Sequence, residues 1–568
     1  MKTDKALFRE ALNDELWQKI KESPKYASQR KNLCDAWNIS CEKPLMPVSF
    51  DAFMAYKRTG SRREFSKEYF AKRLALNSSF VSYMIYREDK YLNKLENILM
   101  NILDEYTWSD PGHIGELCDA ESVSTFIDLF AAETGQALSE ILYLIGDKLD
   151  THVSTRIRYE VNRRIINSFI NKRFPFEDSM SNWATVCSGS VGMTFIYMAP
   201  EKFSLIKERV RSCFLNYLSG FGDDGACAEG VGYWVYGFGY YLYFEELYKE
   251  FSGDYLIPIG EKHKEIAMFM QRAHIGGKSV ISFSDGSQEE FIMSGVVFKA
   301  NEIFGDCVRI LPKDAYAPPV MGGDNCYRFA HCIRNFLWYN PDKLPKSEER
   351  VNETVFLENS QWYIKRNASY VFAAKGGWND DPHNHNDVGS FLISDGRKQL
   401  LADIGKGEYN SGYFKPETRY DNFCCASRGH SLPIIDGIEQ SPGREYRGKI
   451  LENNNDFVSM DISGAYDNEN LTAFVRSFSF KDKSVILTDE ITQNNPSVWT
   501  ERFISLIEPV VGEASVRIEN LTIHSSIKTA PTVKVEKMYG HFEHILIPVY
   551  IIDYNTDERK VEFRFEME

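Results

Sequence analysis

The hydrophobic period of this chain changes once along its length, and the change restricts the folds that the chain can adopt. Before it, apolar residues recur every three to four positions, as in RYEVNRRIINSFINKRF (158–174) and EKFSLIKERVRSCFLNYL (201–218), which is typical of amphipathic helices. After the charged segment NPDKLPKSEERVNET (340–354), stretches such as SVILTDEIT (484–492) and KVEFRFEME (560–568) are β-branched, aromatic or alternating, which is typical of strands. The sequence therefore predicts a multi-helix domain followed by an all-β domain.

A length of 568 residues exceeds the roughly 250 to 300 residues at which single hydrophobic cores stop growing. Two domains are therefore expected, with helices over residues 1–340, a linker over 341–353 and a β-sandwich over 354–568. A cleft between two such domains is a natural place for a binding site. No repeat of fixed length is visible, so identical solenoid units are not predicted, but helical hairpins of unequal length could still close into a ring.

Composition excludes several classes of protein. The formal net charge of -15 argues against nucleic acid as the main partner, because binding phosphates requires a basic face, but it leaves an anionic substrate possible in a locally positive site. No run of about 18 apolar residues predicts a membrane span. The N-terminus lacks the apolar core of a signal peptide, which indicates a cytoplasmic protein, or a periplasmic or secreted one whose signal was removed. The 11 cysteines form no CxxC pair and are expected to be mostly free thiols.

Imidazoles, amides and carboxylates gather in GGWNDDPHNHNDVGSFLISDGRKQLLADIG (376–405), at the entry of a segment with the pattern of a β-hairpin. The dipeptide Asp395-Gly396 predicts a two-residue turn that pairs Ser394 with Arg397. This register decides which polar residues meet at the far end of the hairpin.

The same register predicts a metal site. It sets Asp403 opposite Val388, three residues from His385, and His430 in ASRGHSLP follows 27 residues after Asp403. Two imidazoles and one carboxylate suit a borderline divalent cation, with Zn²⁺ expected first and Mn²⁺ as the alternative. The competing interpretation is that the asparagines and Asp387 only cap turns at a strand entry, and it leaves the histidines unexplained.

A second unusual stretch, DDGACAEGVGYWVYGFGYYLYFEELY (223–248), is rich in tyrosine and glycine. In a helix Tyr233, Tyr236 and Tyr240 lie on one face. Each glycine in the helix interior costs about 1 kcal/mol relative to alanine, which a sequence can accept where a substrate or another backbone approaches closely. The alternative is an aromatic stripe that packs in the core. Upstream, Asn182 lies at an expected helix start, where it or Ser181 would cap the helix.

Taken together and in order, the motifs NW (182–183), CSGSVG (187–192), DGACAEGVGYWVYG, HNHNDVGSF, LLADIG, RY and RGHS resemble those of the heparinase II/III-type polysaccharide lyases. The resemblance implies an incomplete (α/α) toroid followed by an antiparallel β-sandwich. It implies a uronic-acid polysaccharide as substrate, cleaved by β-elimination to products with a C4=C5 double bond. Glycosaminoglycans such as heparan sulfate, hyaluronan or chondroitin are favoured, and alginate or oligoalginate is the alternative.

The resemblance also implies roles for individual residues. Asn182 would engage the uronate carboxylate, Tyr236 would be the phenol acid and base, and His383 would be a second catalytic group. Tyr420 would be a further catalytic tyrosine, and Tyr233 is the alternative register for Tyr236. The implied metal is structural, with ligands His385, Asp403 and His430. The residues expected to contact substrate are Tyr233, Trp234, Tyr240, Glu229, Tyr413 and Arg419.

Two other functions are compatible with the same residues. Helical toroids also host inverting glycoside hydrolases that use two carboxylates, and Asp223, Asp224 and Glu229 could supply such a pair. Against this, DDG has the pattern of a turn, and Glu229 has the place of a first-turn acid favoured by the helix dipole. A non-catalytic glycan-binding protein is the other alternative.

Overall fold

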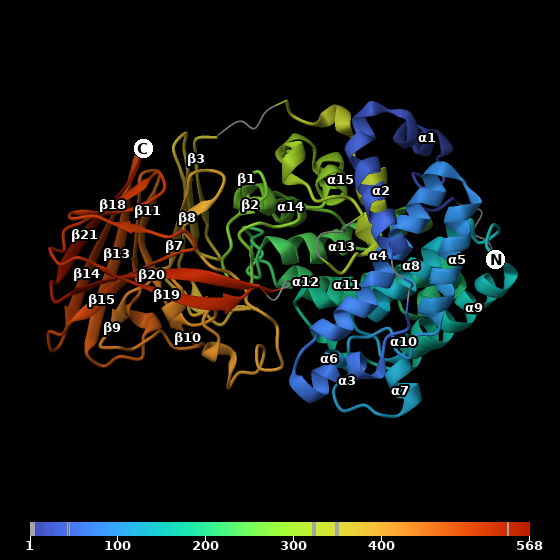
Figure 1. The fold of residues 1–568 in the computed structure, drawn as a ribbon, viewed down its shortest axis with the longest axis horizontal. Helices are drawn as coiled ribbons and strands as arrows, with labels where there is room; N and C mark the ends of the chain where they lie inside the picture. Colours follow the sequence, from blue (N-terminus) through green and yellow to red (C-terminus); the bar gives the residue numbers. More distant parts are fainter. Residues whose placement is uncertain (1–5, 43, 45, 321–324, 347–350, 542–544) are drawn as a thin grey trace. The chain divides into compact units, whose positions relative to one another are not determined.

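The computed structural model (Figure 1) describes residues 6–42, 44, 46–320, 325–346, 351–541 and 545–568. The chain forms two compact units. The helical unit comprises Met1–Gly220, Tyr233–Ala267 and Phe291–Pro345, and the β unit comprises Phe221–Gly232, Met268–Glu290 and Lys346–Glu568. The β unit thus includes two short segments from the part of the chain that the sequence assigned to helices. Residues 347–350 of the expected linker lie outside the described residues.

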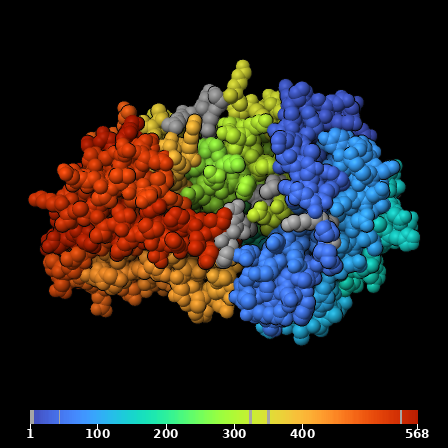
Figure 2. Space-filling view, viewed as in Figure 1, coloured from blue at the N-terminus to red at the C-terminus, as the bar shows by residue number. Residues whose placement is uncertain are grey.

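The helical unit is built from helices joined by short turns. They are α1 (Asp14–Glu22), α2 (Ala27–Glu42), α3 (Phe50–Thr59), α4 (Arg63–Tyr86), α5 (Asp89–Leu103), α6 (Pro111–Ile114), α7 (Ala120–Thr125), α8 (Leu129–Ile145), α9 (Thr151–Val161), α10 (Asn167–Asn171), α11 (Asn182–Met198), α12 (Lys207–Ser219), α13 (Val231–Ser252), α14 (Glu261–Ala273), α15 (Ser294–Phe304) and α16 (Phe329–Leu337). The N-terminal helices, blue in Figure 2, are visible on the surface of this unit.

Helices α4, α8 and α11 lie inside the helical unit, because they are buried around nearly their whole circumference, as expected for helices without a polar face. Small residues in CSGSVG let α11 approach α13 closely. A Cβ atom on Gly192 would lie 2.4 Å from the Phe244 ring, and one on Gly189 would lie 3.3 Å from the Tyr240 carbonyl oxygen. This close packing holds the start of α11 beside the early turns of α13.

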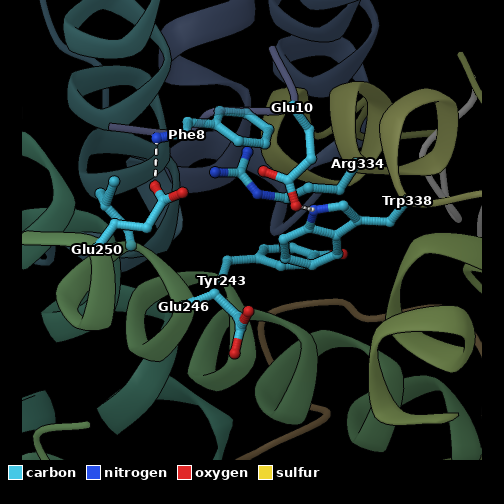
Figure 3. Close-up of a pocket in the computed structure, with 8 residues that line it drawn as sticks. Phe8, Glu10, Tyr243, Glu246, Glu250, Arg334 and Trp338 are labelled. Atoms are coloured by element: carbon cyan, nitrogen blue, oxygen red, sulfur yellow. Dashed lines mark hydrogen bonds between the residues drawn. The ribbon is translucent and has the colours of Figure 1, made fainter. Parts of the chain in front are cut away.

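The N-terminal segment is anchored in a small pocket of the helical unit (Figure 3). Glu250 of α13 accepts the backbone N–H of Phe8, and the Trp338 indole N–H donates to Glu10 at 3.1 Å. The Arg334 guanidinium lies 4.3 Å from the centroid of the Phe8 ring, a favourable cation–π contact. The chain's own aromatic rings therefore surround this cation, which helps to hold α13 and α16 together.

The β unit contains antiparallel sheets. The eight-stranded sheet has the order β11-β12-β13-β14-β21-β18-β17-β16, a five-stranded sheet has the order β3-β4-β5-β7-β8, and a four-stranded sheet has the order β19-β20-β15-β9. Their strands are β3 (Glu353–Leu357), β4 (Trp362–Arg366), β5 (Val371–Lys375), β7 (Phe391–Ser394), β8 (Gln399–Leu401), β9 (Ile434–Ile435), β11 (Lys449–Asn454), β12 (Phe457–Asp461), β13 (Leu471–Lys481), β14 (Ser484–Gln493), β15 (Trp499–Ser505), β16 (Val510–Val511), β17 (Ser515–Ile518), β18 (Leu521–Ser525), β19 (Thr532–Tyr539), β20 (Leu546–Thr556) and β21 (Lys560–Met567). Two short pairs complete the unit, β1 (His274–Gly276) with β2 (Ser279–Val280), and β6 (Trp378–Asn379) with β10 (Gly443–Arg447).

The apolar faces of the three larger sheets meet in one core. β21 alternates between exposed and buried residues, the pattern of a strand with one buried face. The Phe391 ring of β7 lies 5.6 Å from the Phe565 ring of β21 and 6.0 Å from the Phe503 ring of β15. The strand that follows the HNHNDVGS motif is thereby packed into the core of the sandwich.

The predicted register of the β7–β8 hairpin is wrong. Ser394 pairs with Gln399 instead of Arg397, and Ile393 pairs with Leu401. The turn is longer because the Asp395 carboxylate accepts the backbone N–H groups of Arg397 and Lys398, at 2.8 and 3.0 Å, an arrangement that Asp favours in turns.

Candidate functional site

The first cluster of predicted site residues lies in the helical unit at the start of α11. Ser181 is the N-cap of this helix, as expected, and Asn182 is its first residue. The Asn182 side chain is only 2% exposed, yet its Oδ1 has no hydrogen-bond partner in the described part of the chain. One turn later, the Thr185 hydroxyl donates to the Gly237 carbonyl of α13 at 3.0 Å. A buried acceptor without a partner is costly in a folded protein, and Oδ1 is suited to accept a hydrogen bond from an N–H or O–H group of a ligand.

Tyr236 lies on α13 and contacts a buried cation. The Arg328 Nη1 donates to the Tyr236 hydroxyl at 2.6 Å, and the Arg328 Cζ lies 3.6 Å from the centroid of the Tyr236 ring. The same guanidinium nitrogen lies 2.6 Å from a carboxylate oxygen of Glu133 on α8. Burial raises the pKa of Tyr236 well above its usual value, and the Arg328 charge opposes this rise. Neither Arg328 nor Glu133 was predicted as a site residue, because neither stands in a recognisable sequence motif.

The other aromatic residues of α13 have different surroundings. Trp234 is fully buried, and its indole N–H donates to the Ile266 carbonyl at 2.6 Å, so in this structure it packs in the core. Tyr240 is also fully buried, with its ring 5.6 Å from that of Tyr236. Tyr233 is partly exposed.

The glycines of α13 make room for neighbouring side chains. A Cβ atom on Gly237 would lie 2.6 Å from the Tyr217 hydroxyl, and one on Gly239 would lie 3.1 Å from the His331 ring. The sequence predicted that another group approaches α13 closely at its glycines. In the structure, side chains of α12 and α16 make this approach.

The second cluster lies in the β unit, around His383. This histidine has a backbone φ of 59°, a left-handed conformation that is uncommon for a residue other than glycine and often marks functional positions. Its Nδ1 lies 2.6 Å from Asp285 Oδ2, and its Nε2 lies 3.4 Å from Glu229 Oε2. Glu229 precedes α13 instead of lying in its first turn, because the helix begins at Val231. Glu229, which the sequence predicted in the first turn of the helix, therefore lies beside the His383 imidazole.

Asp285 is fully buried and accepts hydrogen bonds on both of its oxygens. His385 Nε2 and the Tyr413 hydroxyl lie 2.9 and 2.6 Å from Oδ1. His383 Nδ1 lies 2.6 Å and Arg419 Nη2 lies 3.4 Å from Oδ2. Burial alone would raise the pKa of Asp285, but the hydrogen bonds from His383 and His385 hold it well below its usual value. Asp285 was not predicted as a site residue, because its only local sequence signal is the turn-like stretch SDGS (284–287).

The predicted metal ligands His385, Asp403 and His430 come together. All three are fully buried, and their possible ligand atoms lie within 4.8 Å of one another. His430 Nδ1 is 3.0 Å from Asp403 Oδ2, and its Nε2 is 2.9 Å from the Cys424 carbonyl oxygen. A carbonyl only accepts, so Nε2 carries a proton and the neutral ring turns a lone pair toward the Asp403 carboxylate. Two acceptors in that position require a proton or a cation between them.

His385 fits a cation at the same place. Its Nδ1 is buried and has no hydrogen-bond partner among the described residues, whereas its Nε2 contacts Asp285. Histidines that bind metals through one nitrogen commonly donate the other N–H to a carboxylate or carbonyl, and both His385 and His430 have this arrangement. The thiol of Cys425 lies beside His385 and Asp285 as well. The donor set is therefore suited to a borderline divalent ion.

The remaining predicted site residues line the same loop region. Tyr413 is fully buried against Asp285, and Arg419 donates twice to the Asn384 carbonyl, at 2.9 and 2.8 Å. Tyr420 is half-buried, and its hydroxyl accepts from Asn384 Nδ2 at 3.3 Å. Burial raises the pKa of Tyr420 above its usual value.

Two of the carboxylates considered for a hydrolase, Asp223 and Asp224, are not placed as a buried catalytic acid. Asp224 accepts the backbone N–H groups of Asn359, Ser360 and Ala226, at 2.8, 3.1 and 3.0 Å, so it is a structural cap. Asp223 is exposed. Neither provides the buried acid that such a mechanism requires.

Solved structures share this fold over nearly the whole chain. A heparinase III structure is 13% identical with a TM-score of 0.61, covering 97% of this chain and 91% of its own. A mutant heparan sulfate lyase from Pedobacter heparinus is 13% identical with a TM-score of 0.57, covering 97% and 90%. A chondroitin AC lyase from Streptomyces coelicolor, in complex with chondroitin sulphate, is 10% identical with a TM-score of 0.56, covering 98% and 82%. The predicted fold class, an (α/α) toroid followed by an antiparallel β-sandwich, is confirmed.

The sequence comparison matches part of the β unit to a known family. Residues 349–538 match the family model described as Heparinase II/III-like, C-terminal, in agreement with the family that the motifs resemble. No curated protein sequence matches the chain. Among the described residues, no helix has the length and apolar character needed to cross a bilayer.

Proposed function

We propose that this protein is a polysaccharide lyase that cleaves uronic-acid-containing polymers by β-elimination. The observation that carries the proposal is the Tyr236 hydroxyl, held 2.6 Å from the Arg328 guanidinium, on a helix packed against the one that begins at the buried Asn182. Together they supply a phenol next to a cation and an amide whose Nδ2 can donate to a carboxylate. The names of the similar structures, which are lyases of heparan and chondroitin polymers, support the same reaction.

The chemistry explains why these groups are needed. The proton on C5 of a uronate is too weakly acidic to be removed while the adjacent carboxylate keeps its full charge. Hydrogen bonds from donors such as the Asn182 amide stabilise the enolate-like charge that develops on that carboxylate. The Tyr236 hydroxyl, whose phenolate the Arg328 charge favours, then takes the proton or protonates the departing C4 oxygen.

His383 is the second acid or base of the proposal. Asp285 holds its Nδ1, and Nε2, which lies 3.4 Å from Glu229 Oε2, is the nitrogen proposed to exchange a proton with substrate. One phenol can serve both steps when the proton and the leaving group are on the same face of the sugar, whereas opposite faces require two residues. Tyr236 is proposed for the first case, His383 is proposed as the second group that the other case would need, and Tyr420 is a further candidate for proton transfer.

A divalent metal, Zn²⁺ first and Mn²⁺ as the alternative, is proposed for His385, Asp403 and His430. When bound, it would supply a structural cross-link between the hairpin and the loop that carries His430. The residues of this chain hold those two segments in place around the ion and orient the neighbouring Asp285.

The substrate class is proposed from the similar structures together with the site. Heparan sulfate and chondroitin sulfate are the first candidates, hyaluronan follows, and alginate or oligoalginate is the alternative in the same fold. All of them present a uronate carboxylate for Asn182, so only turnover can rank them.

Ultraviolet absorbance on a panel of uronate polymers tests the proposal. Lyase products carry a C4=C5 double bond conjugated to the carboxylate and absorb, and the Tyr236→Phe variant should lose this signal by about 100-fold or more while Tyr233→Phe keeps most of it. Reducing ends that appear without an absorbance rise would indicate a hydrolase. Binding without any product, unchanged in Tyr236→Phe, would indicate a glycan-binding protein.

A further inference from the structure

We propose that Asp285 is a positioning residue that links the metal ligand His385 to the catalytic histidine His383, so that an intact metal site sets the orientation of His383. The inference rests on the proposed function for the role of His383. It assigns a role in the reaction to a metal site that would otherwise be only structural.

The carboxylate of Asp285 joins the two imidazoles through different oxygens. His385 Nε2 lies 2.9 Å from Oδ1, and His383 Nδ1 lies 2.6 Å from Oδ2. A carboxylate only accepts, so each of these ring nitrogens carries a proton. His383 is thereby held with Nδ1–H directed to Asp285, and its Nε2 lies on the other side, 3.4 Å from Glu229 Oε2.

The surroundings of Asp285 fix its position. Tyr413 and Arg419 provide a third and a fourth donor to the same carboxylate, which compensates a charge that is fully buried. With both oxygens engaged, the carboxylate cannot rotate without breaking several hydrogen bonds. It therefore behaves as a rigid connector between the two rings.

The loop that carries Asp285 is attached to the segment that carries the metal ligand Asp403. The Ser282 hydroxyl donates to the Asp403 carbonyl at 2.8 Å, and the Lys406 N–H donates to the Gly286 carbonyl at 3.0 Å. A Cβ atom on Gly405 would lie 2.3 Å from that same carbonyl oxygen, so glycine is required for this approach. The backbone thus joins the Asp285 loop to the metal site independently of the side chains.

The two nitrogens of His385 have separate tasks in this arrangement. Nδ1 is buried with no hydrogen-bond partner among the described residues, while Nε2 donates to Asp285, and one ligand atom of this ring lies within 4.8 Å of ligand atoms of Asp403 and His430. If His385 held a cation through Nδ1, its ring would keep a single tautomer and orientation, with Nε2–H directed to Asp285. Without the ion His385 can change tautomer or rotate, and Asp285 loses one of its fixed donors.

The test compares Asp285→Asn with Asp387→Asn in the full-length protein. Asp387 is a matched control because it is also fully buried and lies two residues beyond His385, but its partner is Lys375, at 2.6 Å. Metal per chain is measured by elemental analysis, kcat and KM are measured separately on the best uronate polymer, and circular dichroism reports folding. We expect Asp285→Asn to weaken metal binding about 10-fold or more and to lower kcat about 100-fold or more, with KM within about threefold.

Asp387→Asn should lose stability but keep its metal and most of its kcat. The proposal is overturned if Asp285→Asn keeps both metal and kcat, or if Asp387→Asn shows the same loss of metal with the same kcat and KM pattern. If Asp285→Asn does not fold, the wild-type protein stripped by a chelator is used instead. It should then lose kcat at constant KM and recover when Zn²⁺ is returned, whereas full kcat in the folded, metal-free protein overturns the coupling.

Failure of the proposed function would have a different signature. Wild-type protein that produces no unsaturated product from any polymer rejects the lyase assignment. The metal content of Asp285→Asn still decides whether Asp285 orients His385.

Discussion

The Arg328 guanidinium contacts the Tyr236 phenol in two ways, since Nη1 lies 2.6 Å from the hydroxyl oxygen and Cζ lies 3.6 Å from the ring centroid. Burial opposes ionisation of the phenol, and the cation favours it. The reactivity of Tyr236 therefore depends on the balance between these two effects, and each can be altered separately.

Replacing Arg328 should move the activity to higher pH. In Arg328→Gln the charge that lowers the pKa of Tyr236 is lost, so this pKa rises further and the phenolate fraction at a given pH falls about tenfold for each pKa unit. The rising limb of kcat/KM against pH should shift to higher pH. Arg328→Lys keeps a cation and should shift less. Superimposable profiles for the wild type and Arg328→Gln would contradict the assigned role.

Replacing Asn182 should separate function from stability. Asn182→Ala removes the amide that the substrate carboxylate needs, and kcat/KM should fall about 100- to 1,000-fold, as for the loss of one oxyanion-stabilising donor. Because the amide oxygen is buried without a partner, its removal should leave the free energy of unfolding within about 1 kcal/mol of wild type, or increase it. Turnover and urea unfolding, measured on the same samples, check the expected fall in kcat/KM and the expected free energy of unfolding. A large loss of stability would mean that the amide has a structural role.

Elemental analysis should find one divalent ion per chain, and His430→Ala should lose it. At a zinc concentration about 1,000-fold above Kd, bound metal adds roughly 4 kcal/mol to stability, so chelation should lower the midpoint of thermal unfolding. His524→Ala is the control, because this histidine lies on a strand of the eight-stranded sheet, away from the metal ligands. Equal metal content in wild type and His430→Ala would exclude this ligand set.

A buried carboxylate on α13 should make stability depend on pH. Glu245 is fully buried, where it accepts the N–H groups of Leu256 and Ile257 at 2.7 and 3.0 Å, and burial raises its pKa to about 8. A raised carboxyl pKa means that its stabilising contribution is complete below the unfolded value, near pH 4.5, and is lost as the pH rises through about 8.

Glu245→Gln should therefore flatten the dependence of the unfolding midpoint on pH between 5 and 8, and it should be more stable than wild type at pH 8. Each pKa unit corresponds to about 1.4 kcal/mol. Glu246→Gln, which changes a neighbouring and partly exposed carboxylate, should leave the wild-type pH dependence in place. Parallel pH curves for wild type and Glu245→Gln would show that Glu245 is ionised in the folded protein.

The sequence predicted the site unevenly, and the reason differs from residue to residue. Asn182, Tyr236, His383 and the three metal ligands stand in motifs with chemically distinctive residues, so the residue types alone nominated them. Trp234 stands in the same motif, but the structure buries it in the core, because a motif does not tell which face of a helix is covered.

Asp285 and Arg328 had no such signal. Asp285 lies 98 residues before His383, and Arg328 lies 92 residues after Tyr236, so only folding brings each pair together. The hairpin register failed for a local reason, since the Asp395 side chain bonds two backbone N–H groups and lengthens the turn.

The sequence by itself determined the order of a helical domain and a β domain, because hydrophobic period follows directly from helix and strand geometry. It also determined the residue types available for metal binding and proton transfer. Tertiary structure alone decided which of them share a hydrogen bond. The protonation of Tyr236 and the orientation of His383 depend on partners distant in the chain, because burial and charge act through space and not along the sequence.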